Sequence, residues 1–168
     1  MRSNALGDGS STLAVAEAVA TNEHIVMFCE IPVKKLRDDV VTELDLKGRS
    51  IGTCGALVVA RLLEFSRALK SANLAENEIG DQGAIAISAA LESNTSLTKL
   101  DLSAKGYGPM IGIAYGTMIS TAGAQAIAKM LVVNRALKSV DLRNNRIPDR
   151  GKRKLRDAVG DISITLQV

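Results

Sequence analysis

The stretch "LKSANLAENEIGDQGAIAISAALESN", from Leu69 to Asn94, combines two kinds of apolar spacing in one segment. Its first six residues, "LKSANL", carry apolar side chains at the first, fourth and sixth positions, and they alternate as a short strand with one buried face does. A turn follows, with Ile79 as its apolar residue. The remainder has the i, i+3, i+4, i+7 spacing of one helix face, at Ala84, Ile87, Ser88 and Leu91. The stretch therefore predicts a strand, a turn and a helix.

The same pattern recurs along the chain. Six-residue segments with this spacing begin at Val41, Leu69, Leu97 and Leu137, so that successive steps are 28, 28 and 40 residues. The twelve extra residues of the last step lie between Lys105 and Ile119, as an insertion in one repeat. The helical spacing also returns in two further repeats, at Ala56, Val59, Ala60 and Leu63 and at Ala124, Ile127, Ala128 and Leu131.

Four aligned copies of strand, turn and helix resemble the leucine-rich-repeat proteins, in particular the ribonuclease-inhibitor-like subclass. The resemblance implies an α/β solenoid, a curved horseshoe segment with parallel strands on the concave face and helices on the convex face. The family's asparagine is present as Asn77 and Asn145, where it would bond the backbone of neighbouring turns. Arg49 and Lys105 replace it in the first and third repeats, and we expect the asparagine ladder to be broken there.

We predict a single leucine-rich-repeat domain over residues 1–168. Its repeats are 41–68, 69–96, 97–136 with the twelve-residue insertion, and 137–161, followed by a terminal strand at 162–168. Residues 1–40 are interpreted as a partial, degenerate repeat. Its helix would turn Thr12, Val15, Ala16 and Val19 inward, and a strand-like run begins at Ile25. If the chain begins inside a repeat, the apolar side of this helix lacks a neighbour, so Val15 and Val19 would be partly exposed or covered by another molecule. We then expect self-association through this N-terminal edge, unless an absent domain covers it.

Composition narrows the function classes. His24 is the one histidine, so no Ser-His-Asp or Cys-His constellation and no histidine metal cluster can be assembled. We therefore predict a protein without catalytic activity, metal or cofactor. Cys29 and Cys54 are too few for a disulfide framework and are interpreted as buried thiols of a reducing compartment, which predicts a cytoplasmic protein. No apolar run reaches the length of a membrane span, and we expect no membrane partner.

Polar residues at equivalent strand positions should form columns on the concave face. One column is Asp45, Asn73, Asp101 and Asp141. Three interpretations stand beside one another: polar residues demanded by strand alternation, an acidic stripe that meets basic groups of a partner, and a divalent-metal or hydrolase site. The candidate binding residues of this face are Glu43, Asp45, Lys47, Asn73, Lys99, Asp101, Asp141 and Arg143.

The insertion contains the glycine-rich stretch "AKGYGPMIGIAYGT". Its glycines approach a G-x-G-x-x-G phosphate motif, but Ile111 stands where the third glycine belongs and no G-K-[ST] follows. Residues 104–118 are either a neutral surface insertion or a recognition element, whose binding residues would be Tyr107, Met110, Ile111 and Tyr115.

The basic segment 143–156 has no interleaved aromatics for base stacking, so it favours a solvated capping helix and no nucleic-acid partner. These observations predict an interaction module that binds another protein through its concave face and the insertion. The alternative is a structural or autoinhibitory fragment of a larger scaffold or sensor protein.

Overall fold

The computed structural model describes residues 9–106, 118–160 and 164–168. Tyr107, Met110, Ile111 and Tyr115, the predicted binding residues of the insertion, lie outside the described residues. In chain order the elements are α1 (Gly9–Thr21), α2 (Val33–Arg37), β1 (Glu43–Asp45), α3 (Gly52–Leu63), β2 (Ser71–Asn73), α4 (Gly80–Ser93), β3 (Lys99–Asp101), α5 (Thr121–Val133), β4 (Ser139–Asp141), α6 (Asp149–Val159) and β5 (Thr165–Gln167).

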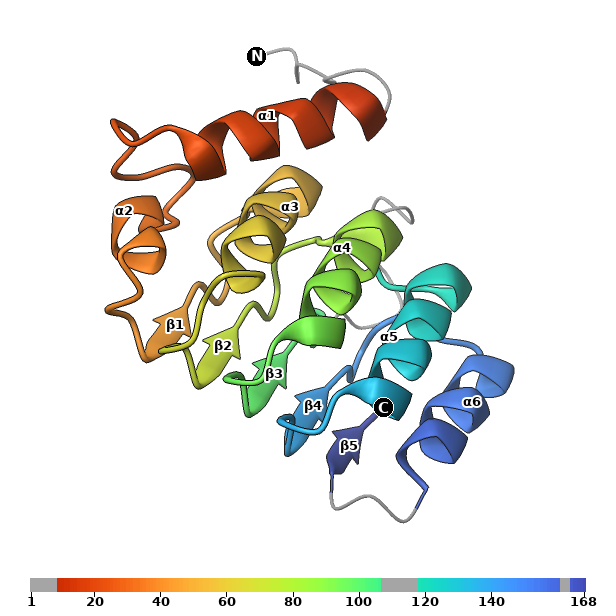
Figure 1. The fold of residues 1–168 in the computed structure, drawn as a ribbon. Coiled ribbons are helices and arrows are strands. Elements are labelled where there is room, and N and C mark those ends of the chain that lie inside the picture. The colour runs from red at the N-terminus through yellow and green to blue at the C-terminus, as the bar shows by residue number, and fades with distance from the viewer. Residues whose placement is uncertain (1–8, 107–117, 161–163) are drawn as a thin grey trace.

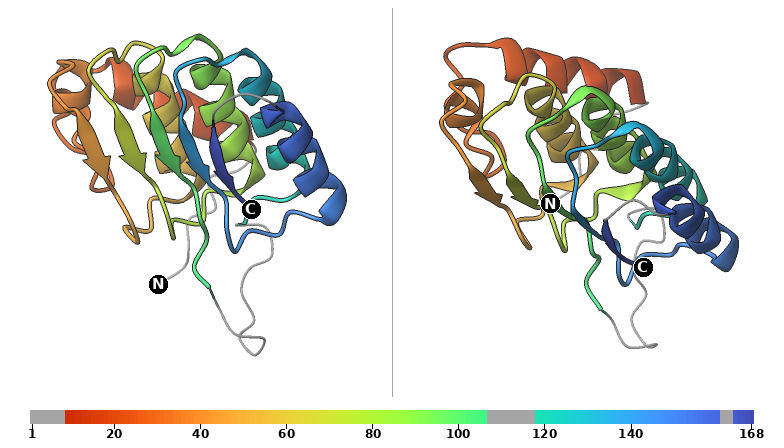
Figure 2. Two further views of the ribbon diagram at one scale, coloured as in Figure 1. Left: turned by 90° about the horizontal axis from the view of Figure 1, so that it is seen from below. Right: turned by 60° about the horizontal axis from the view of Figure 1, so that its bottom comes forward.

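The five strands form one parallel sheet in the order β1-β2-β3-β4-β5, with each strand bonded to the next along the chain (Figure 1). The register aligns the middle residues of all five strands, Leu44, Ala72, Leu100, Val140 and Leu166. Figure 2 shows the strands as one layer and the helices as a second layer on one side of it. This arrangement confirms the predicted α/β leucine-rich-repeat solenoid.

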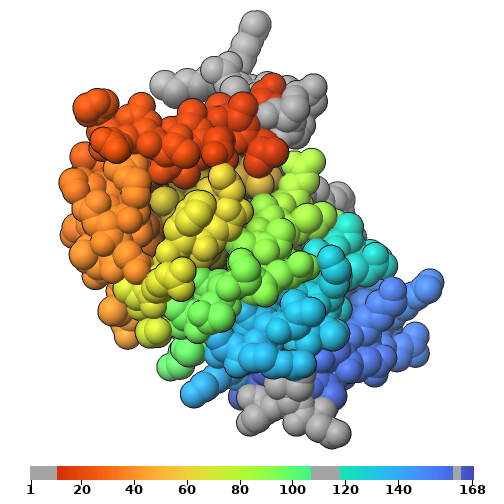
Figure 3. Space-filling view, viewed as in Figure 1, coloured from red at the N-terminus to blue at the C-terminus, as the bar shows by residue number. Residues whose placement is uncertain are grey.

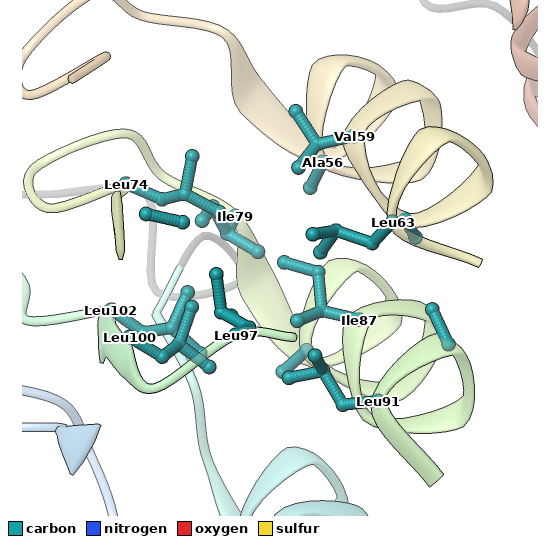
Figure 4. Packing of buried hydrophobic residues seen from close by; sticks show 14 of the residues in the cluster. Ala56, Val59, Leu63, Leu74, Ile79, Ile87, Leu91, Leu97, Leu100 and Leu102 are labelled. Carbon is teal, nitrogen blue, oxygen red and sulfur yellow. The ribbon is translucent and has the colours of Figure 1, made fainter. Parts of the chain in front are cut away.

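The core lies between the two layers (Figure 4). Leu100 of β3 and Ile87 of α4 are 2% and 1% exposed, and their side chains meet those of the next repeats in one continuous cluster. Glycine lets successive helices approach closely. A Cβ added at Gly83 of α4 would stand 2.8 Å from the Ala56 Cβ of α3, which is closer than real Cβ contacts allow.

The asparagines of the ladder join neighbouring turns. Asn77 donates from Nδ2 to the carbonyls of Leu46 (2.7 Å) and Ala75 (3.1 Å), and Asn145 donates in the same way to the carbonyls of Leu102 (2.9 Å) and Leu142 (3.0 Å). Between these two rungs, at Lys105, the turns of the second and third repeats enclose a cavity of about 40 Å³. Residues that line it include Leu74, Asn77, Ile79, Leu102 and Lys105. A cavity of this size with backbone groups in its wall has room for ordered water.

Restoring the missing rung should stabilise the protein. We expect Lys105→Asn to raise the free energy of unfolding by about 1 kcal/mol, since an asparagine there fills the cavity with backbone hydrogen bonds. Urea denaturation followed by circular dichroism measures the effect. Arg49→Asn is the matched control, because the first repeat has no regular preceding turn to bond, and its effect should stay within about 0.5 kcal/mol. Equal or lower stability of Lys105→Asn would contradict the interpretation of the cavity.

A second set of asparagines stands at the ends of α4 and α5. Asn94 Nδ2 donates to the carbonyls of Leu63 (2.8 Å) and Ser66 (3.0 Å) in the preceding repeat. Asn134 Nδ2 donates to the carbonyls of Leu91 (2.7 Å) and Asn94 (2.9 Å). Each Oδ1 also accepts from backbone N–H groups two and three residues later. Both asparagines are buried, so their hydrogen bonds join one repeat to the next within the core.

In the first repeat, Ser66 occupies the position of these asparagines, and the Asp39 carboxylate accepts the remaining hydrogen bonds. Leu69 N–H donates to Ser66 Oγ (3.3 Å), while Asp39 Oδ1 accepts from Ala68 N–H (2.9 Å) and from the Ser66 hydroxyl (2.9 Å). The hydrogen bond from the Ala68 N–H is the main reason that the pKa of Asp39 lies below its ordinary value. Asp39 thus substitutes for the amide oxygen of the asparagine.

The N-terminal part differs from the prediction. The strand-like run from Ile25 joins no sheet, because the chain reverses at once in a hairpin whose single bridge pairs Phe28 with Ile31. Its two turn residues, Cys29 and Glu30, have left-handed φ values of 45° and 65°. Cys29 is exposed at this turn, so its interpretation as a buried thiol is wrong. The following helix, α2, has five residues.

The first helix is covered on its apolar side. Ala16 and Val19 are 0% and 6% exposed, and α1 lies over α3 (Figure 3). The Arg37 guanidinium of α2 donates to the carbonyls of Asn22 (2.7 Å), Glu23 (3.1 Å) and Ile25 (3.3 Å) just after α1. Val19 is therefore packed against the solenoid, whereas Val15 is half-buried.

Candidate functional site: the face of the sheet away from the helices

The sheet presents alternate strand residues to solvent. In β1 to β4 the middle residue is buried against the helices, whereas the flanking residues are half-buried or exposed. The register places Asp45, Asn73, Asp101 and Asp141 side by side in one column, and Gln167 of β5 continues it. A second column contains Glu43, Ser71, Lys99, Ser139 and Thr165.

The acidic column has a structural role in every repeat. Each Oδ1 accepts a hydrogen bond from the backbone N–H two residues later, at 3.1 Å for Asp45, 3.2 Å for Asn73, 2.9 Å for Asp101 and 3.0 Å for Asp141. This is the Asx turn, which only aspartate and asparagine side chains can form. The turn redirects the chain as each strand ends. It requires the side-chain oxygen and not the negative charge, as Asn73 demonstrates.

Asp101 allows these two roles to be separated. We expect Asp101→Ala to lower the free energy of unfolding by about 1 kcal/mol, since the Ser103 N–H loses its acceptor. Asp101→Asn keeps the amide oxygen and should stay within about 0.5 kcal/mol of the wild type. Chemical denaturation of the two variants compares them directly. If both variants were equally stable, the turn would contribute nothing measurable.

Within the ranges that the structure describes, Asp141 is the member of the column that pairs with a neighbouring cation. Arg143 donates from Nε to both Asp141 oxygens at 3.0 Å and from Nη2 to Oδ2 at 2.6 Å. Partial burial acts to raise the pKa of Asp141, but the hydrogen bonds from Arg143 outweigh it and lower the pKa. Asp141, with some help from Asp101, raises the pKa of Arg143.

The other predicted residues differ in how far their charges are satisfied. Lys47 Nζ lies 3.3 Å from Glu76 Oε1, a contact that the sequence pattern did not indicate. Glu43 and Lys99 are exposed and have no ion-pair partner within the described part of the chain. A shallow hollow of about 350 Å³ lies over β2 to β5, and its lining includes Asn73, Lys99, Asp101, Asp141 and Arg143.

The chemistry of this face is that of fixed charges and hydrogen-bonding groups. His24, the one histidine, lies far along the chain from the columns, in the turn after α1, where its backbone N–H donates to Asn22 Oδ1. No group of three metal-ligand side chains occurs among residues 9–106, 118–160 and 164–168. In the same ranges no helix has the length and apolar character to cross a membrane. The arrangement suits contact with another polar surface.

Comparison with known proteins agrees with this fold. The model of the leucine-rich-repeat family matches residues 66–88 and 133–155, which are two stretches running from one strand into the following helix. No curated protein sequence matches the chain. Among solved structures, actin-binding site 2 of leiomodin-1 is similar, with a TM-score of 0.69 and 18% identity, and the match covers 84% of this chain and 79% of that one. Two of its repeats therefore match the leucine-rich-repeat family model, and the chain has the leucine-rich-repeat fold.

Proposed function

We propose that this chain is a non-catalytic module that binds another protein through the exposed face of its sheet. One observation carries the proposal: Glu43 and Asp45 of β1 and Lys99 and Asp101 of β3 present charges at a spacing that the sheet fixes, with β2 between the two strands. Charges held in this way orient a partner and select against wrong ones. The proposed contact residues are Glu43, Asp45, Lys47, Asn73, Lys99, Asp101, Asp141 and Arg143.

The distribution of charge favours a basic partner surface. Arg143 already neutralises Asp141, whereas Asp45 and Glu43 at the β1 end are exposed. We expect lysine or arginine side chains of the partner to meet the β1 to β3 part of the column. Leiomodin-1 actin-binding site 2 shares only the fold at this level of identity, but the partner in its name makes actin a defined first probe.

The test separates charge from fold. Proteins retained from a lysate by the wild type are compared with those retained by the double variant Asp45→Asn, Asp101→Asn, which preserves the Asx turns. Glu92→Gln, on α4 and paired with Lys129 at 3.2 Å, is the control on the helix side. A partner of the sheet face should bind the double variant at least about tenfold more weakly than the wild type. It should bind the Glu92→Gln control as tightly as the wild type. A partner that binds all three equally would refute the proposal.

The insertion is proposed as a second contact, through Tyr107, Met110, Ile111 and Tyr115. Tyrosines are enriched among the residues that dominate interface energy. With a partner in hand, Tyr107→Ala and Tyr115→Ala should each weaken binding by more than about 1 kcal/mol, as calorimetry would measure. Unchanged binding of both variants would leave residues 104–118 as a neutral insertion.

The alternative role is structural or autoinhibitory, within a larger scaffold or sensor. Two features favour contacts at the N-terminal edge: Val26, Met27 and Val40 are 55%, 55% and 68% exposed, and β1 has no strand on its outer side in the described chain. Self-association through this edge would give sedimentation coefficients that rise with concentration. A monomer at all concentrations argues against self-association through this edge.

We also propose a cytoplasmic location, which imaging of a fluorescent fusion in source cells tests.

A further inference from the structure

We propose that Cys29 and Cys54 are a redox pair, whose reversible disulfide fastens the 28–31 hairpin to the first turn of α3. The chain contains no other cysteine, and the two residues are free thiols in the structure. They come from different elements, the tip of the hairpin and the start of a solenoid helix. Neither takes part in the proposed binding face.

Contacts on both sides of the hairpin place it against α3. Ile31, two residues after Cys29, is fully buried, and its Cδ1 lies 3.4 Å from the position of a Cβ added at Gly55. Gly55 directly follows Cys54. On the other side, the Glu30 carboxylate lies 3.8 Å from Arg49 Nη1, in the loop that leads into α3. The two cysteines therefore belong to segments that are in contact.

The pKa of Cys54 agrees with this arrangement. Burial is the larger cause that raises the pKa of Cys54, and the negative charge of Cys29 is the second. An interaction with the Cys29 thiol agrees with the contacts of Ile31 and Glu30, which bring the two segments together. Cys29 is exposed and Cys54 is half-buried. An oxidant in solution thus meets Cys29 first.

Cys29 stands at the tip of a tight hairpin. Two backbone hydrogen bonds close it, from Phe28 N–H to the Ile31 carbonyl (3.0 Å) and from Ile31 N–H to the Phe28 carbonyl (2.8 Å). Cys29 and Glu30 hold left-handed φ values of 45° and 65°, which cost free energy for residues other than glycine.

The reaction balances with a peroxide as oxidant. The Cys29 thiolate attacks one oxygen of hydrogen peroxide, which gives a sulfenic acid and hydroxide. The Cys54 thiol then loses its proton and attacks the Cys29 sulfur, expelling a second hydroxide as the S–S bond forms. Overall, two thiols and one peroxide give one disulfide and two waters. A dithiol reductant such as dithiothreitol reverses the change. Because the pKa of Cys54 is raised, bond formation should accelerate between pH 7 and pH 9.

The experiment uses the whole reduced chain and hydrogen peroxide. Oxidation should remove both free thiols, lower the mass by two hydrogen atoms, and leave a monomer on a non-reducing gel. Trypsin should then release residues 3–34 and 50–61 as one linked species. The cross-link closes a loop between the hairpin and α3, so the melting temperature should rise by about 5–10 °C and fall back with dithiothreitol.

Cys29→Ser and Cys54→Ser are matched controls, and neither should show a peroxide-dependent rise in melting temperature. Three outcomes would overturn the proposal. In the first, both thiols stay free while peroxide is consumed elsewhere. In the second, each thiol is oxidised to sulfinic acid without a cross-link. In the third, the disulfide joins two chains as a dimer. If Cys54→Ser folds poorly, Cys29→Ser alone decides the thermal result, because its side chain is exposed.

Discussion

Replacing Asn94 with alanine should lower the free energy of unfolding by about 3–5 kcal/mol, because each buried group left without a partner costs roughly 1–3 kcal/mol. Its Nδ2 donates to the carbonyls of Leu63 and Ser66, and its Oδ1 accepts from the N–H groups of Ser96 and Leu97. The side chain is 5% exposed, so water cannot replace these bonds without opening the structure. Alanine removes both ends of the link between two repeats.

The chain supplies a control of the same residue type. Asn22 makes the corresponding turn after α1, where its Oδ1 accepts from His24 N–H at 2.9 Å, but it is exposed. Asn22→Ala should therefore cost less than about 1 kcal/mol. Urea denaturation of both variants gives the comparison, with Asn134→Ala expected to resemble Asn94→Ala. If Asn94→Ala costs no more than Asn22→Ala, the buried bonds do not contribute to stability as argued.

Asn94 and Asn134 also mark a limit of prediction from the sequence. Their positions after two helices were visible, but asparagine there is also compatible with an ordinary helix end. Their main contacts are carbonyls of the preceding repeat, roughly one repeat length away along the chain. Aligning the residues that follow each helix would have indicated a shared role, since Asn22 and Ser66 occupy the same position in their repeats. The bonding itself depends on tertiary structure.

The columns of the sheet face show a similar division. The alternation of apolar and polar residues predicted which strand residues face away from the core, and the strand register places those residues side by side. It did not predict the Asx turns, which give Asp45, Asn73, Asp101 and Asp141 a reason to recur without any partner. The Asp→Asn variants proposed above matter for this reason. Assignment to the ribonuclease-inhibitor-like subclass and the use of this face for binding stay predictions.

The structure of the N-terminal segment could not be predicted, because its residues favour a strand while the short distance to the first full repeat leaves no room for one in the sheet. The residues from Ile25 to Cys29 have strand character, yet sixteen residues before Val41 leave little length for a full repeat. The chain resolves this by turning back at Cys29 and burying Ile31 against α3. Short-range pattern favoured a strand, whereas packing against the first full repeat decided for a hairpin.

Leu100→Ala should destabilise the protein by about 2–5 kcal/mol, the usual range for a buried leucine. Leu100 is 2% exposed in the central strand β3, between Ala72 and Val140 of the neighbouring strands. In Figure 4 its side chain points with Leu102 into the cluster formed with α4. Lys99→Ala, one residue away on the exposed face, should stay within about 0.5 kcal/mol. Equal losses for both variants would contradict the alternation of β3.

The same variant tests how cooperative the solenoid is. Each repeat is stabilised by its neighbours, so damage at the central strand should lower protection on both sides of β3. Hydrogen exchange with mass spectrometry should then show faster exchange in α3 and α5 as well as in α4. Asn94 and Asn134 join these repeats through buried bonds, which is the physical route for such coupling. Faster exchange confined to β3 and α4 would instead indicate repeats that unfold independently, with the asparagine bonds too weak to couple them.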